Sequence, residues 1–144
     1  MNRRELLQTV GAVGAVGAPA AMLAQQSPHV HGAAAHQSLV AAASDCVAKG
    51  EICLAHCHQN LAEGDKSLGA CAESVSEMLA LCGALGSIAA QDAPSLPKLS
   101  AVVLDACRRC EAECRKHQNE HSQCKDCADA CVACAAECRK VASA

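Results

Sequence analysis

The sequence predicts an all-α protein, an antiparallel up-down-up-down four-helix bundle with a cysteine-lined core. Beyond residue 35 the chain is rich in Ala, Leu, Glu, Gln and Lys and poor in β-branched residues, a composition typical of helices. Three short segments with helix stop and start signals divide this region into four stretches of helical length. Because short connections favour antiparallel neighbours, consecutive helices should run in opposite directions.

The three breaks define the expected helices in chain order. Gly64 and Asp65 offer a helix stop followed by an N-cap. The segment 92–97, DAPSLP, holds two prolines and a candidate cap at Ser95. The polar segment 119–122 ends in another candidate cap. The expected helices therefore cover residues 36–63, 66–90, 95–119 and 122–141.

The first 24 residues predict an export signal, although an amphipathic helix is the alternative. Arg3 and Arg4 precede a weakly apolar Gly/Ala/Val stretch, and the small residues at 18–20 suit a signal peptidase. The paired arginines resemble twin-arginine signals, whose substrates are exported already folded. We expect a periplasmic protein. Its expected parts are a signal over 1–24 that is cleaved near 20–24, a flexible His-containing arm over 25–35, and a metal-binding bundle over 36–144.

Charge and hydropathy argue against two classes of partner. The formal net charge is -3, with no run of basic residues and no Phe, Tyr or Trp on which bases would stack, so nucleic acid is not an expected partner. After the signal, no segment approaches the roughly 18 uninterrupted apolar residues of a membrane span. We therefore expect no membrane association of the mature form.

Thirteen cysteines dominate the pattern of the expected helices. At about 100° per residue, their intervals return to one face of each helix, so all of them should point inward. The alternative is that Cys serves here as an ordinary small core residue. The candidate ligands are Cys46, Cys53, Cys57, Cys71, Cys82, Cys107, Cys110, Cys114, Cys124, Cys127, Cys131, Cys134 and Cys138.

Disulfides, zinc and iron-sulfur clusters fit this pattern poorly. Thirteen is odd, and cysteines three or four apart on one helix do not readily reach disulfide geometry. Zinc commonly takes its thiolates from C-x2-C loops flanked by turns, whereas the C-x2-C pairs here lie inside expected helices. Iron-sulfur clusters favour cysteines from irregular chain, such as a run that ends in Cys-Pro, and no such run occurs.

Copper(I) fits better. It selects thiolate and thioether ligands and accepts two or three of them, so one pair of cysteines on a helix offers a site. A buried thiolate without a cation is costly, and roughly one Cu(I) per thiolate would leave a filled core near neutral. The sequence therefore predicts many Cu(I) ions per chain.

Alternating helices bring one set of histidines to one end of the bundle. Near His56 and His58 this end should also hold His117 and His121, which follow the cysteines of the third helix at spacings that share their face. We expect His56, His117 and His121 to bind copper at an open mouth, and His58 to be solvated. Met78 should be core packing, with a thioether ligand as the alternative. An apolar plug should close the other end; its members are Leu39, Leu85, Leu99 and Val141.

The chain resembles the copper storage proteins, specifically their exported branch with a twin-arginine signal. The segments that carry the resemblance are DCVAKGEICLAHC (45–57), LGAC (68–71), LCGAL (81–85), CRRCEAECRKH (107–117) and CKDCADACVACAAEC (124–138). The resemblance implies a four-helix bundle that stores Cu(I) for copper enzymes, without enzymatic activity, and that assembles as a tetramer. Methionines mark the mouth in that family, whereas Asn60 and Leu68 stand there in this chain.

Two other functions remain open from the sequence. A copper chaperone would transfer a single ion and would need one exposed site. A zinc- or iron-sulfur-binding helical protein would need sets of four convergent cysteines.

Overall fold

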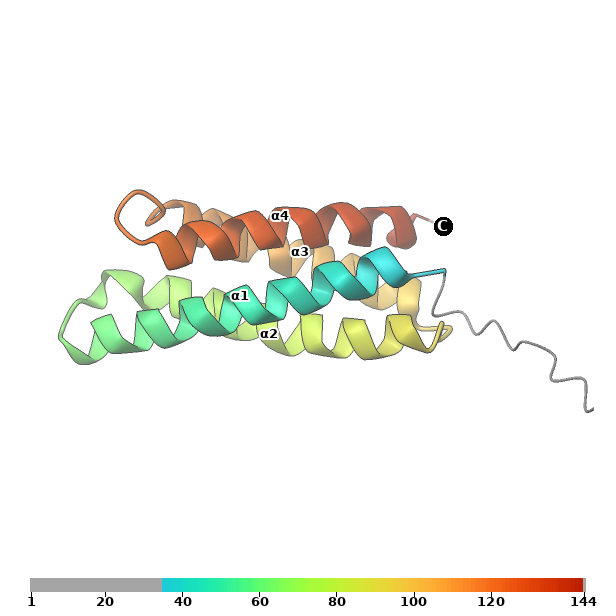
Figure 1. Cartoon of the computed structure of the whole chain (residues 1–144), viewed down its shortest axis with the longest axis horizontal. Helices are drawn as coiled ribbons and strands as arrows, with labels where there is room; N and C mark the ends of the chain where they lie inside the picture. The colour runs from blue at the N-terminus through green and yellow to red at the C-terminus, as the bar shows by residue number, and fades with distance from the viewer. Residues whose placement is uncertain (1–34, 144) are drawn as a thin grey trace, which may run out of the picture.

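Four long helices run alternately up and down along one axis in residues 35–143, the part of the chain that the computed structural model describes (Figure 1). These residues contain no strand, which confirms the predicted fold class. The predicted signal and nearly all of the predicted arm lie outside the described residues. The elements are α1 (Gln37–Ala62), the short 3-10 helix η2 (Lys66–Leu68), α2 (Gly69–Ala90), α3 (Leu96–Arg115) and α4 (Ser122–Ala142).

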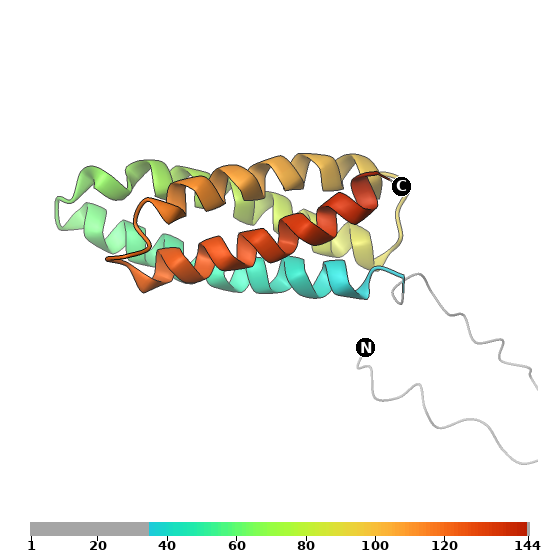
Figure 2. The ribbon, with the colours of Figure 1, turned by 90° about the horizontal axis from the view of Figure 1, so that it is seen from above.

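The helices close a four-sided bundle. α1 packs against α2 and α4, and α3 packs against the same two helices from the opposite side. Figure 1 shows that the α1–α2 and α3–α4 connections lie at one end, while the α2–α3 connection and the C-terminus lie at the other. Seen from above, the four helices again run lengthwise beside one another (Figure 2).

The α1–α2 connection contains the predicted helix stop and N-cap. Gly64 has φ +99°, in the left-handed region where residues with a side chain are strained. Asp65 then caps η2, because its side-chain oxygen accepts a hydrogen bond from the Ser67 backbone N–H at 2.9 Å. The helix stop and start predicted at this pair are both present.

The α3–α4 connection is longer than predicted. α3 ends at Arg115 and not at 119, because the backbone N–H groups of Lys116 and His117 bond three residues back and tighten the chain into turns. This segment, KHQNE, is polar and offers no apolar residue that would reward a further helical turn. His121 is the N-cap residue of α4, in extended backbone, and Ser122 is the first residue of that helix and not its cap. Ser95 likewise makes no capping hydrogen bond.

One end of the bundle is closed by apolar side chains, as predicted. Leu39 and Leu85 are buried there, and Leu99 and Val141 are partly buried and pack against the core. His36 Nε2 lies 3.0 Å from Asp92 Oδ1 and ties the start of α1 to the α2–α3 connection.

The segment Lys66–Ala90 is long and apolar enough to cross a membrane by length and composition alone, with a mean hydropathy of 1.3 over its best window. This differs from the expectation that no segment beyond the signal comes close. In the bundle the segment comprises η2 and α2, and 39% of its apolar window is buried. Its buried side carries Cys71, Val75, Met78 and Cys82, which face the other helices of the bundle.

Candidate metal centre

All thirteen cysteines lie in the interior as unpaired thiols. The intervals of three and four along α4 turn its five cysteines toward the bundle axis, and the same spacing acts on α3. Each of the thirteen is at most 1% exposed. The structure therefore confirms the predicted inward orientation of every cysteine, and no disulfide joins any of them.

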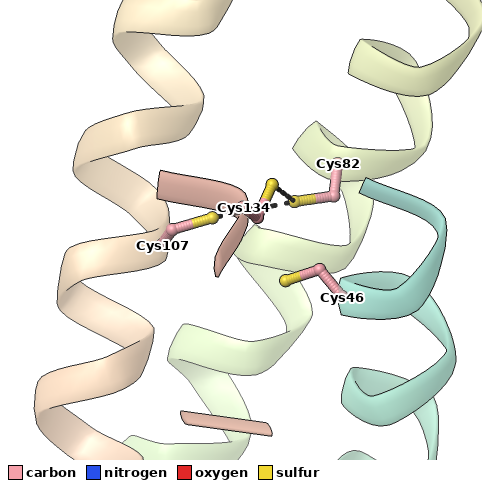
Figure 3. A group of neighbouring side chains, drawn as sticks. All are labelled: Cys46, Cys82, Cys107 and Cys134. Carbon is pink, nitrogen blue, oxygen red and sulfur yellow. Dashed lines mark hydrogen bonds between the residues drawn. The ribbon is translucent and has the colours of Figure 1, made fainter. Parts of the chain in front are cut away.

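Two sets of four sulfur atoms converge from several helices, each set with its atoms within 4.8 Å of one another. The mouth group lies toward the end with the α1–α2 and α3–α4 connections; its members are Cys53, Cys57, Cys71 and Cys124. The inner group takes one cysteine from each helix; its members are Cys46, Cys82, Cys107 and Cys134. Figure 3 shows the four side chains of the inner group pointing at a common centre.

Further sulfur contacts join the two groups into one column. At the mouth end, Cys71 Sγ lies 3.4 Å from Cys114 Sγ, which lies 4.0 Å from Cys110 Sγ. Cys110 Sγ lies 3.9 Å from Cys127 Sγ, and these two form a group of three with Cys131.

Cys131 completes the connection, because its Sγ lies 3.7 Å from Cys46 Sγ in the inner group. On α4 one further cysteine, Cys138, follows Cys134 toward the closed end. An ion at the mouth thus has a continuous row of sulfur neighbours along the interior.

Neighbouring thiols control one another's protonation. Hydrogen bonds from Cys114 hold the pKa of Cys71 below its ordinary value, and hydrogen bonds from Cys110 do the same for the pKa of Cys127. The pKa of Cys82 is raised, first by its hydrogen bond to Cys107 and also by burial. Within a group, neighbouring thiols therefore stabilise the negative charge on one sulfur and disfavour the ionisation of the next.

The size of the repulsion between two neighbouring thiolates decides whether the thiols of the metal-free core are protonated. Cys82 Sγ and Cys107 Sγ lie 3.8 Å apart. Two negative charges at this separation repel by about 4 kcal/mol at an effective dielectric constant of about 20, which corresponds to roughly 3 pKa units. Most of the thiols must therefore keep their protons until a cation takes their place.

Three half-buried histidines meet at the mouth, as predicted. His56 Nε2 lies 2.8 Å from His121 Nδ1, and the His117 and His121 ring centres are 6.3 Å apart. His58 is exposed, also as predicted. The backbone that positions two of these histidines differs from the prediction. His117 lies in the α3–α4 connection and His121 is the N-cap residue of α4, whereas both were expected on a helical face of α3.

Asn60 is a mouth residue whose role the sequence did not reveal. Its side-chain amide donates to the His56 backbone carbonyl at 2.9 Å and lies 3.3 Å from His56 Nε2. The spacing of four residues on one helix was the available signal. Asn60 thus helps to hold the His56 ring beside His121.

Comparisons with known proteins agree with this geometry. The sequence model of one family, described as copper storage protein, matches residues 32–143. The apo form of copper storage protein 3 from Bacillus subtilis is 28% identical with a TM-score of 0.65, and the match covers 74% of this chain and 97% of that one. The Cu(I)-bound copper storage protein BsCsp3 is 30% identical with a TM-score of 0.66, covering 74% and 96%. No match was found among curated proteins.

Proposed function

This chain belongs to the copper storage protein family, and we propose that it holds many Cu(I) ions in its core, on the order of one per cysteine. The observation that carries the proposal is the continuous column of buried, unpaired thiols from the mouth group through the inner group. A site for one ion would need two or three of these sulfurs. The storage proposal assigns the remaining thiols to further ions.

Charge balance favours Cu(I) over zinc in this interior. A zinc ion held by the four thiolates of the inner group would leave a net charge of about -2 in a fully buried site. A singly charged ion for each thiolate leaves the site neutral. Each Cu(I) that enters releases about one proton, because the thiols it meets are mostly protonated.

The storage proposal predicts a long, linear Cu(I) titration of the reduced full chain under anaerobic conditions. Thiolate-to-copper bands in the near ultraviolet should grow to about as many equivalents as there are thiols, with about one proton released per ion. The absence of Phe, Tyr and Trp leaves this spectral region clear. A plateau at one equivalent would identify a chaperone, and equal competition by zinc would identify a zinc protein.

Copper enters at the mouth in this proposal. His56, His117 and His121 are half-buried above the mouth group, whereas leucines close the opposite end. Imidazole is a suitable ligand for copper. An arriving ion is held first between the His56 and His121 rings and then passes to the sulfurs below.

Replacing His56 and His121 with alanine should slow loading without changing capacity. If each ring contributes about 1.4 kcal/mol to holding the arriving ion, the initial rate of Cu(I) uptake falls about tenfold per histidine. Stopped-flow absorbance after mixing with a Cu(I)-chelator complex measures this rate. The matched control is His58→Ala, an exposed histidine on the same helix, which should load at the rate of the unchanged chain. An unchanged rate in the double variant would place uptake elsewhere.

We also propose that the protein reaches the periplasm folded. Arg3, Arg4 and the small residues at 18–20 support a twin-arginine signal. Folding in the reducing cytoplasm buries the thiols before they meet oxidising conditions. Replacing both Arg3 and Arg4 with lysine should keep the protein in the cytoplasm. Fractionation of the bacteria that produce it measures this location. A periplasmic location of that variant, or transport in unfolded form, would refute the proposal.

The assembly and its recipients complete the proposal. We propose a tetramer of bundles that supplies copper enzymes or removes excess copper. Catalysis is not part of this proposal, because it assigns the buried cysteines the role of metal ligands and not of nucleophiles.

A further inference from the structure

Met78 adds one thioether sulfur to the column of thirteen cysteine sulfurs. The residue lies on α2 between Cys71 and Cys82 and is fully buried. Its Sδ accepts a hydrogen bond from the Cys46 thiol at 3.3 Å. This separation is shorter than the sulfur contacts that join Cys46 to Cys131 and Cys82 to Cys107.

The neighbouring helix α1 makes room for this side chain. A Cβ atom added to Gly50 of α1 would lie 2.6 Å from Met78 Cε and 2.9 Å from Leu79 Cδ2. Any larger residue at position 50 would therefore displace the end of the methionine. The missing side chain at Gly50 lets Met78 lie against α1, with its sulfur beside Cys46.

Met78 also fills a gap in the distribution of thiols. α3 and α4 together carry eight cysteines, whereas α1 and α2 carry five. Because Cys71 meets Cys114 and Cys82 meets Cys107, Met78 stands at the level of Cys110 between them. The sulfur group at that level, which contains Cys110, takes its cysteines from α3 and α4 alone. Met78 is the sulfur that α2 contributes there.

The chemistry of this pair suits Cu(I). A thioether is a soft ligand without charge, so one Cu(I) held by the Cys46 thiolate and the Met78 thioether has no net charge in a buried site. We propose that Met78 and Cys46 together bind one Cu(I) ion inside the bundle. This role of Met78 rests on the proposed storage function. On loading, Cu(I) replaces the proton that the Cys46 thiol donates to Met78: the S–H bond breaks, the Cu–S bond forms, and the proton leaves to solvent.

Selenium X-ray absorption of the selenomethionine-labelled full chain tests this site directly. The chain has three methionines, Met1, Met22 and Met78, and the first two lie outside the described residues. After Cu(I) loading, about a third of the selenium should show a copper neighbour at bonding distance, and metal-free protein should show none. Met22→Leu should raise this share to about a half, because it removes one of the two selenium atoms that should have no copper neighbour.

The matched control is Met78→Leu, which keeps the side-chain volume and should abolish the copper neighbour at equal loading. A chain that binds copper but shows no selenium–copper contact would overturn the inference and leave the storage function intact. A contact that persists in Met78→Leu would also overturn it, since it would come from Met1 or Met22. Failure of the unchanged chain to bind copper would overturn both the inference and the proposed function.

Discussion

Replacing the four cysteines of the inner group with alanine should remove about four Cu(I) ions from the capacity of the chain, at roughly one ion per thiolate. The members of this group, Cys46, Cys82, Cys107 and Cys134, come from all four helices and share no other function in the proposal. Their loss empties one section of the sulfur column and leaves the mouth intact. Elemental analysis after anaerobic loading and desalting measures the capacity.

The mouth group provides the comparison for this variant. Its four cysteines are as deeply buried, so alanine should cost a similar amount of capacity and a similar amount of packing, on the order of 1 kcal/mol per site. Only the mouth variant should also load slowly, because ions reach the remaining thiols through this group. Circular dichroism checks that both variants keep the helical bundle. A capacity that stays unchanged in the inner variant would show that its thiols are packing residues and not ligands.

Copper loading should raise the melting temperature by more than about 20 °C. The metal-free core has no aromatic side chain and is filled largely with alanine and thiols, so the hydrophobic stabilisation per residue is small. A ligand at about 100 times its dissociation constant adds about 2.7 kcal/mol per site. For a bundle of this length, each kcal/mol moves the melting temperature by about 4 °C, so a few filled sites suffice.

Differential scanning calorimetry of metal-free and loaded protein, both reduced and anaerobic, measures this shift. Removing copper with an excess of a Cu(I) chelator should return the melting temperature to the metal-free value, which separates binding from oxidation. The inner-group variant should gain less than the unchanged chain. A loaded protein that melts at the metal-free temperature would contradict binding within the folded core.

Helix periodicity predicted most of the candidate centre. The intervals between cysteines place them all on one face of each helix. Because a four-helix bundle has a single interior, that face, with its thiols, was expected to line it. The turn at Gly64 and Asp65 was predictable for a similar reason, because both residue types favour that backbone.

What the sequence could not predict depends on contacts between helices and on a loop. The end of α3 was placed four residues too late, because the polar segment after Arg115 has acceptable helix propensity and only the missing tertiary packing ends the helix there. Periodicity placed His117 and His121 on a helical face, yet a loop brings His121 to His56. The contact between Met78 and Cys46 depends on Gly50 of the facing helix, which a single-helix pattern does not reveal.

The most direct test of the account is an anaerobic count of the Cu(I) ions that the fully reduced chain withholds from a competing chromogenic Cu(I) chelator. The chelator stays colourless while the protein binds more tightly, so the onset of colour marks the number of strong sites. The account predicts an onset near thirteen ions per chain, the number of buried thiols. Colour from the first or second equivalent would contradict storage and leave the thiols as a core without copper.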